Sequence, residues 1–411
     1  MDEVNIELRK VLEAAVQSNQ SIEYNETTLK ELYQQKLLEL KMSGTQIENL
    51  LGISHKALLA IFNNTGERID IINIIKLAHF LGLSVNDIMK LYVPNMPVEQ
   101  IGEIQKAREA GYIISNFDIP TMKKIGFFTS SDLQTVQSLF NIKKRIVNFF
   151  GLSTIYDYTE TNIFPAFSRS KKSSDNLVRT FWVNSAYRHF ELINNPNPYN
   201  REALLKLMPN IRPYSRNERN GLRIVAKALF NVGVTVIFQE SLPKLQTKGA
   251  TFAYNNKPCI VLSDLNKRYP TLWHVLLHEL HHVLYDFDEI LEQTYHITGE
   301  DDLFLINEVA ADSFASDYLL SKDRLKYITP YINSRIIVDK CAQEWGVHPS
   351  IIYAMYCYNL SEQGSRNAWK LPICKYIPSM DVALELFNTH PFEKESLLES
   401  VKTIKEIIYN V

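Results

Sequence analysis

The segment His278-Glu279-Leu280-His281-His282 constrains this chain most, because it has the form H-E-x-x-H within a stretch of helical periodicity. Residues four apart lie on one face of a helix, so His278 and His282 can bind a single metal ion. Glu279 lies about 100° further round the helix, where its carboxylate can hold and deprotonate a water molecule. The motif therefore predicts two metal ligands and a general base, the arrangement of zinc peptidases.

The residues around the motif favour a buried helix. Pro270 suits the first turn, where its missing amide hydrogen would have no acceptor. Apolar residues recur at helical spacing, at Trp273, Leu276, Leu277, Leu280 and Leu284. A core helix without metal is the alternative, but four histidines in nine residues are poor core chemistry. We expect His274 to pack beneath the site and the spacing of four to favour His282 over His281 as a ligand.

A catalytic zinc site usually has a third protein ligand and one open position. The downstream candidates are Glu289, Glu300, Asp301, Asp302, Glu308, Asp312 and Asp317. Glu289 follows the motif too closely, and Asp301 and Asp302 lie in a polar stretch expected to be a loop. Glu308 begins an alanine-rich run with high helix propensity, whose small side chains allow close approach to the first helix. We predict that Glu308 is the third ligand and that Asp312 orients a ligating histidine; a solvated acidic helix face is the alternative.

Five segments are similar to the ImmA/IrrE family of bacterial metallopeptidases, namely 249–251, 259–263, 273–284, 307–315 and 346–349. Family members commonly have glycine where this chain has His281, which leaves the predicted ligands unchanged. The spacing of Glu308 and Asp312 also resembles the wider gluzincin pattern.

The resemblance implies a small sheet packed on helices, a metal site of His278, His282 and Glu308, and Glu279 as general base. Zinc is the expected cofactor, although manganese or iron fits the same ligands. Characterised relatives cleave a repressor protein and so switch on a stress response or a mobile element. The resemblance therefore implies a repressor-like protein as substrate.

Residues 28–93 are predicted to form five short amphipathic helices. Thr45, with Glu48 three residues later, predicts a capping box for a helix through Leu51. Gly52 then forms a turn, and Ser54 caps a helix that ends at Asn63. Further helices are expected over 70–80 and 85–92. The pattern resembles the Xre-like helix-turn-helix family.

In a DNA-binding version of this module, the helix after Ser54 would enter the major groove. The residues predicted to contact DNA are Gln46, His55, Lys56 and Asn63. Basic and acidic residues are nearly balanced over 28–95, whereas DNA affinity depends mostly on phosphate contacts. DNA binding and docking to a protein therefore both stay open as uses of this module.

Strands are predicted over 234–238, 251–254 and 259–262, with a hairpin turn over 255–258. The residues Thr251, Phe252, Ala253 and Tyr254 are a candidate edge strand that would pair with an extended substrate backbone. A β-meander without a substrate role is the alternative.

We predict an α+β fold that is mostly helical, with a small antiparallel or mixed sheet in a zincin-like catalytic domain. Four parts are expected: 1–95, the helix-turn-helix domain with an N-terminal helical extension; 96–212, a basic helical connection; 213–330, the peptidase domain; and 331–411, a helical C-terminal region. Pro94 and Pro97 indicate a linker, and 168–174 an exposed loop. An amphipathic helix over 393–408 is suited to docking, so a homodimer is a further candidate assembly.

No apolar run reaches membrane-spanning length, and the acidic start is unlike a signal peptide. Four scattered cysteines without metal-type spacing fit reduced thiols, so we expect a cytoplasmic protein without a membrane partner. The leading hypothesis is a zinc endopeptidase directed by its helix-turn-helix to DNA or a partner. The alternatives are a DNA-binding transcriptional regulator and a toxin–antitoxin component, in which the metal site is structural or sensory.

Overall fold

The computed structural model describes residues 28–65, 69–92, 96, 98–128, 136–160, 174–293, 295–297 and 308–410. The chain divides into two compact units, Met1–Arg108 and Glu109–Val411. Several predicted features lie outside the described residues: the N-terminal extension 1–27, Pro94 and Pro97, the loop 168–173 with the adjoining 167, and Asp301 and Asp302.

The described residues between 28 and 92 of the amino-terminal unit form five short helices, as the sequence predicts: α2 (Leu29–Leu40), α3 (Gly44–Leu51), α4 (His55–Asn63), α5 (Ile71–Leu81) and α6 (Val85–Tyr92). Ser54 caps α4, and Gly52 ends α3 in the left-handed conformation at φ 61°. The predicted cap at Thr45 is wrong. Ser43 caps α3 instead, and Gln46 completes the capping box because it lies three residues after the cap.

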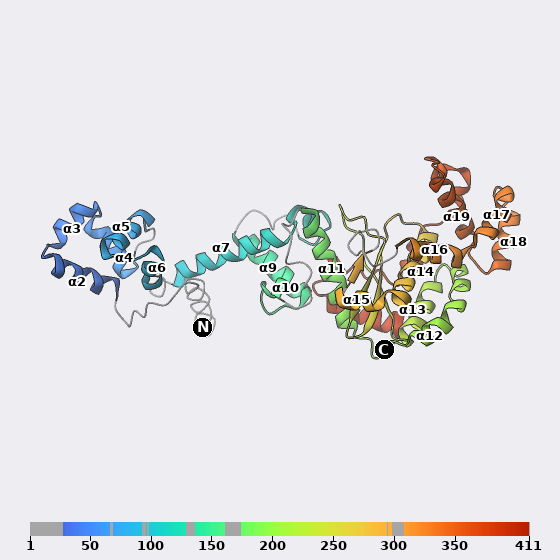
Figure 1. Ribbon diagram of the computed structural model, residues 1–411, viewed down its shortest axis with the longest axis horizontal. Coiled ribbons are helices and arrows are strands. Elements are labelled where there is room, and N and C mark those ends of the chain that lie inside the picture. Colours follow the sequence, from blue (N-terminus) through green and yellow to red (C-terminus); the bar gives the residue numbers. More distant parts are fainter. Residues whose placement is uncertain are drawn as a thin grey trace. The chain divides into compact units, whose positions relative to one another are not determined.

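The second unit begins at Glu109, inside helix α7 (Val98–Asn116), and its described residues are mostly helical (Figure 1). Its further α-helices are α8 (Ile119–Lys124), α9 (Val136–Phe150), α10 (Asp157–Glu160), α11 (Ser174–Ile193), α12 (Arg201–Leu207), α13 (Gly221–Asn231), α14 (Tyr269–Tyr285), α15 (Phe287–Gln293), α16 (Glu308–Leu319), α17 (Lys322–Ile328), α18 (Arg335–Trp345), α19 (Pro349–Glu362), α20 (Asp381–Leu384) and α21 (Leu397–Ile404). Short 3-10 helices are η4 (Met208–Asn210), η5 (Arg212–Arg216), η6 (Thr329–Tyr331), η7 (Ala368–Lys370), η8 (Pro372–Tyr376) and η9 (Pro391–Glu393), and η10 (Lys405–Tyr409) is a π-helix.

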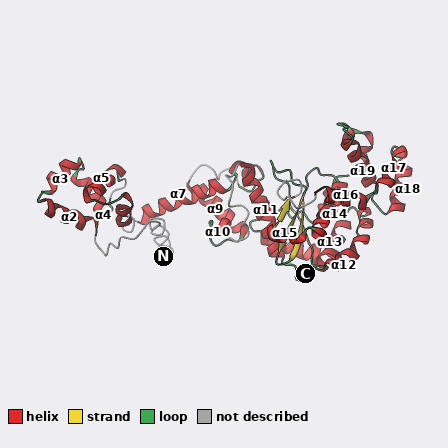
Figure 2. Ribbon diagram, in the orientation of Figure 1, coloured by secondary structure: helices red, strands yellow, loops and turns green. Residues whose placement is uncertain are grey.

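A small sheet lies among these helices (Figure 2). Its strands are β1 (Thr235–Phe238), β2 (Gly249–Tyr254), β3 (Lys257–Leu262) and β4 (Tyr295–Ile297), in the order β1-β3-β2-β4. β1 pairs with β3 in parallel, and β2 is antiparallel to both β3 and β4. The predicted α+β class with a mixed sheet is therefore confirmed.

The predicted hairpin is present and is closed by two asparagines. Asn255 and Asn256 have φ of 50° and 57°, the left-handed values that a two-residue turn requires. The prediction that Thr251 to Tyr254 form an edge strand is wrong, because β4 pairs with β2 from Ala250 to Phe252. β4 has only three residues, too few to produce an alternating pattern in the sequence.

The two faces of β2 contact different helices, because successive side chains of a strand point to opposite faces. Thr251 points toward α14, where its hydroxyl lies 2.7 Å from a carboxylate oxygen of Glu279. Phe252 and Tyr254 contact the ring of Tyr187 in α11. The sheet thus forms a layer between α11 and α14.

The main hydrophobic core of the second unit contains residues from Ile113 to Tyr409. The divisions predicted after residues 212 and 330 fall inside this core. The apolar face predicted for 393–408 is also covered within the unit, since α21 packs on α11 and the Tyr409 ring stacks on Phe230.

Among the described residues, no single helix is both long and apolar enough to cross a membrane, and only the bent pair Ile71–Leu81 with Asn86–Tyr92 passes that test jointly. All four cysteines are free thiols, as predicted.

His189 in α11 gives the folded unit a testable pH dependence. The ring is fully buried and neither nitrogen has a hydrogen-bond partner among the residues that the structure describes, so burial lowers its pKa from 6.5 to about 4. In the unfolded chain His189 therefore becomes protonated below about pH 6.5, whereas in the folded chain it stays neutral down to about pH 4. We expect this residue to remove about 2 kcal/mol of stability between pH 7 and pH 5.

Urea unfolding of wild type and His189→Leu at both pH values measures this contribution. The variant should lose less stability on acidification than wild type, since every other titrating group is shared. An identical pH dependence in the two proteins would contradict the neutral, buried state of His189.

Candidate metal centre

Helix α14 carries the two histidines of the motif into the interior. Pro270 lies in its first turn, as predicted, and the apolar residues at helical spacing are buried against the sheet. His278 and His282 are 2% and 0% exposed, and their Nε2 atoms lie 3.1 Å apart. Spacing on one helix face thus brings the two imidazoles together as expected.

Helix α16 brings Glu308 to the same place. Its carboxylate oxygens lie 3.5 Å from Nε2 of His278 and 3.1 Å from Nε2 of His282. One ligand atom from each of the three residues lies within 4.8 Å of the others. Ala311 and Ala315 are buried on α16, which packs closely against α14 as their small side chains predict.

Two further carboxylates orient the imidazoles. Asp312 Oδ1 lies 2.9 Å from Nδ1 of His278, which is the contact predicted for it. Asp286 Oδ2 lies 2.7 Å from Nδ1 of His282. Ionised carboxylates only accept hydrogen bonds, so each Nδ1 carries a proton and each Nε2 faces the cluster, where a metal ion would take the place of a second proton.

These contacts also set the proton affinity of the cluster. Burial lowers the pKa of His278, but hydrogen bonds to Asp312 and Glu308 outweigh it and raise the pKa to about 10. Burial also lowers the pKa of His282, but hydrogen bonds to Asp286 and Glu308 outweigh it and raise the pKa to about 9. Burial raises the pKa of Glu308, yet its contacts with the histidines hold that pKa far below the ordinary value. The cluster is thus a site that strongly attracts positive charge.

Glu279 is fully buried and faces β2 rather than solvent. Thr251 donates a hydrogen bond of 2.7 Å to its Oε2 atom. A Cβ atom added to Gly249 would lie 2.6 Å from Oε1 of Glu279 and 2.6 Å from Val275. The absence of a side chain at residue 249 therefore makes room for the carboxylate, and Thr251 fixes its orientation.

His296 and Asp286 are site residues that the sequence analysis missed. Nε2 of His296, on β4, lies 2.7 Å from Oε1 of Glu308, and its ring centroid lies 4.8 Å from that of His282. Asp286 follows His282 by four residues, so helical spacing could have found it. His296 gave no such signal, because its position depends on the pairing of β4 with β2.

The remaining histidines near the motif have other contacts. His274 packs one turn before His278, and its Nε2 lies 3.2 Å from Ser316 Oγ. Burial lowers the pKa of His274 to about 4. His281 Nδ1 lies 3.5 Å from Asp286, and its ring packs on Phe314. As predicted, His274 lies under the cluster.

The other predicted site residues are dispersed. Ala253 packs with Phe287 and Ile290 in a small separate hydrophobic cluster. In the amino-terminal unit, the four predicted DNA-contacting residues are exposed: Gln46, His55, Lys56 and Asn63. Gln46 also caps α3 through its side-chain oxygen, and His55 lies 2.7 Å from Glu48.

The donor set of the cluster suits a divalent metal ion. The two Nε2 atoms lie 3.1 Å apart beside the Glu308 carboxylate, so positive charge there, from a proton or a metal ion, stabilises the cluster. The chain matches no family model, no curated protein and no solved structure. Its function must therefore be inferred from the chemistry of this site.

Proposed function

We propose that the protein is a metal-dependent endopeptidase of the ImmA/IrrE kind, with zinc as its metal. One observation carries the proposal: His278, His282 and Glu308 converge within 4.8 Å, and Glu279 follows His278 on the same buried helix. Three protein ligands leave one coordination position for water or substrate, as in catalytic zinc sites. We propose a regulatory, repressor-like protein as the substrate.

In this mechanism, His278, His282 and Glu308 would hold the metal ion, which would act as a Lewis acid toward the scissile carbonyl and a water molecule. Glu279 accepts the proton of the attacking water and passes it to the leaving amine. Thr251 holds one oxygen of Glu279, so the carboxylate keeps a fixed orientation while it moves the proton. Asp312 and Asp286 hold the imidazoles in the Nδ1–H tautomer that ligation needs.

Metal content tests the ligand set. We expect one equivalent of zinc in the wild-type protein by elemental mass spectrometry, and its loss or strong weakening in Glu308→Ala, because two histidines alone leave the site incomplete. Asp317→Ala is the matched control, since Asp317 is an exposed carboxylate on the same helix. Manganese or iron in place of zinc would identify another metal for the same ligands.

No bound metal in wild type, even after addition of zinc, would overturn the proposal. Equal metal content in wild type and Glu308→Ala would remove Glu308 from the ligand set.

The amino-terminal unit would direct the peptidase to its target. The order of α3, a left-handed turn at Gly52 and α4 fits a helix-turn-helix, and α4 presents His55, Lys56 and Asn63 to solvent. Leu59 on α4 is also 37% exposed, and an apolar side chain there suits a protein partner as well as a DNA groove.

The salt dependence of DNA binding separates the two uses. A DNA-binding module should lose affinity for duplex DNA steeply as salt rises, because phosphate contacts release counterions. The Lys56→Ala variant should then have a shallower salt dependence than wild type. No measurable binding to duplex DNA at low salt would favour the protein-docking role.

A regulator with a structural or sensory metal site is the second candidate function, and His296 is the observation that favours it. A fourth protein ligand closes a zinc site to water, and the His296 ring lies in contact with Glu308 beside His282. Such a protein would bind metal without hydrolysing peptides.

A further inference from the structure

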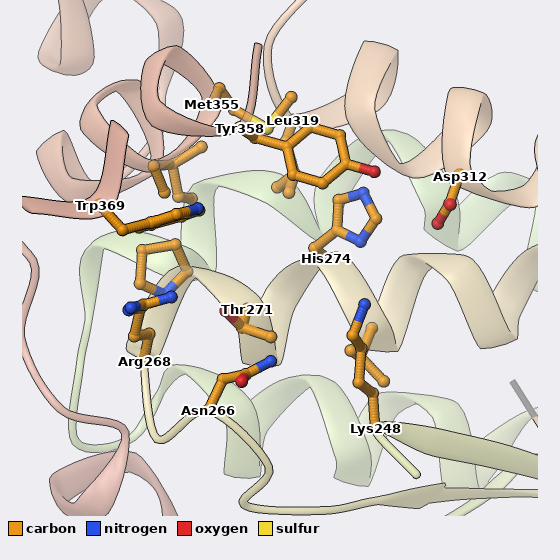
Figure 3. A pocket seen from close by; sticks show the side chains of 14 residues that line it. Lys248, Asn266, Arg268, Thr271, His274, Asp312, Leu319, Met355, Tyr358 and Trp369 are labelled. Carbon is orange, nitrogen blue, oxygen red and sulfur yellow. The ribbon is translucent and has the colours of Figure 1, made fainter. Parts of the chain in front are cut away.

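A cavity of about 370 Å³ lies next to the candidate metal centre and has no role in the mechanism above. It is bounded by the first half of α14, the residue before β2, and helix α19. Figure 3 shows Lys248 and Asn266 on one side of it and Met355 and Tyr358 on the other, with Arg268 next to Trp369. Its volume is at the lower end of ligand pockets, which are about 300–1,000 Å³.

The cavity is electropositive. Lys248 and Arg268 line it, and neither forms an ion pair with any residue that the structure describes. The Arg268 guanidinium lies 4.1 Å from the centre of the Trp369 ring, which holds it at the cavity wall. The N-terminal end of the 17-residue helix α14 adds the positive end of a helix dipole, because Pro270 and Thr271 also line the cavity.

One carboxylate, Asp312, lines the same cavity, but its charge is already engaged. Its Oδ1 accepts the hydrogen bond from Nδ1 of His278 at 2.9 Å. The charge of Asp312 also attracts Lys248, so two cations share one carboxylate that is hydrogen-bonded to His278, and the wall keeps a net positive charge. A ligand that supplies a further carboxylate would complete the charge balance.

The opposite wall is apolar, with Leu319, Ile351 and Met355 beside the rings of Tyr358 and Trp369. A ligand that fits both walls has a hydrocarbon portion and an anionic end. An acidic amino-acid side chain has this composition, and so does the last residue of a peptide with its free carboxylate.

The cavity is close enough to the metal centre to receive part of the same peptide. Asp312 belongs to both, and the ring of His274 in the cavity wall lies 6.5 Å from the ring of His278. Neighbouring side chains of an extended peptide are spaced by about 3.3 Å along the chain. A residue one or two positions from the scissile bond would therefore reach the cavity.

We propose that this cavity is a specificity pocket that binds a carboxylate of the peptide substrate, through Lys248 and Arg268, and so selects where the chain is cut. The inference rests on the proposed peptidase function. It names the substrate class as peptides with an acidic side chain, or a free C-terminus, next to the scissile bond.

Met355 provides a direct probe, because its methyl group lies in the apolar wall. The experiment uses the full chain with Glu279→Gln and ¹³C-methyl methionine, and identifies the Met355 signal by Met355→Leu. The ligands are acetylated, amidated pentapeptides of alanine with a central Glu, Gln or Lys, and an alanine pentapeptide with a free carboxylate. We expect the Glu peptide to shift the Met355 signal with at least tenfold higher affinity than the Gln peptide.

Charge reversal tests the residue assignment. Lys248→Glu should invert the preference from the Glu peptide to the Lys peptide, whereas Lys267→Glu should keep the wild-type preference, because Lys267 is an exposed lysine outside the pocket lining. Binding of the free-carboxylate peptide at equal strength would identify the chain terminus as an equivalent source of the anion. Equal affinity for the Glu, Gln and Lys peptides would overturn the proposal.

The outcomes separate this inference from the peptidase function. Binding at Met355 without hydrolysis by the wild-type protein would overturn the peptidase function and keep the carboxylate pocket. Hydrolysis without a preference for acidic residues, together with an unchanged Met355 signal, would overturn the specificity pocket but not the peptidase function.

Discussion

The Glu279→Gln variant is expected to lose peptide hydrolysis by about 100- to 10,000-fold while it binds as much metal as wild type. Glutamine has nearly the same shape as glutamate, and it can still contact Thr251, but it cannot accept the proton of the attacking water. The ligand atoms of His278, His282 and Glu308 are untouched. The two readouts are hydrolysis of a degenerate, quenched fluorogenic peptide library and metal content by elemental mass spectrometry.

Glu292→Gln is the matched control, since Glu292 is an exposed glutamate on α15 and should keep full activity. Hydrolysis at the wild-type rate by metal-loaded Glu279→Gln would exclude Glu279 as the general base. Inactivity of both wild type and variant, with metal bound, would favour the regulator with a structural or sensory metal.

The second large effect is expected at Gly233, which lies at φ 88° after α13. A Cβ atom there would lie 2.4 Å from the backbone of Pro198 and Tyr199. We expect Gly233→Ala to lose about 3 kcal/mol of stability, since it combines a strained backbone conformation with a collision against backbone that cannot rotate away.

The Gly364→Ala variant separates backbone strain from collision with neighbouring atoms. Gly364 has a similar φ of 91°, but a Cβ atom added there would have no neighbouring atom within 4 Å. Its variant should lose about 1 kcal/mol, from backbone strain alone. Denaturant unfolding of both variants measures the difference. Equal losses of stability would mean that the collision with Tyr199 does not contribute to the effect of Gly233→Ala.

The Gly233 substitution should also affect the metal centre. Asn200 donates its amide hydrogen to Val232, and the neighbouring Tyr199 and Arg201 donate to the carbonyls of Val283 and Leu284 at 2.8 Å each. These carbonyls belong to the last turn of α14, directly after His282. The close approach at Gly233 thus positions the segment that holds the end of the motif helix.

Features that depend on near neighbours in the chain could be predicted from the sequence. Pro270 and the apolar spacing located α14, Ser54 located the start of α4, and two asparagines located the hairpin turn. The predicted cap of α3 was wrong because Ser43 with Gln46 and Thr45 with Glu48 both have the capping-box spacing, and only the hydrogen bonds that Ser43 and Gln46 form distinguish them.

The packing of α16 on α14 was predicted from the ligand chemistry of Glu308 and Asp312, but two other features that depend on distant residues were not predicted. β4 has three residues, so neither its place beside β2 nor the arrival of His296 at Glu308 left a periodic signal. Likewise, the cavity next to the metal centre joins residues of α14, α16 and α19 that no spacing rule connects.

The division of the ligand set between α14 and α16 has a consequence for protein synthesis. A nascent chain that ends before Glu308 contains the whole H-E-x-x-H motif and both histidines, yet lacks the carboxylate and the Asp312 contact that complete the site. A full metal centre can form only after α16 has been translated and has docked on α14. If the proposed function holds, truncated or half-folded chains would be inactive, and hydrolysis would require the completely folded unit.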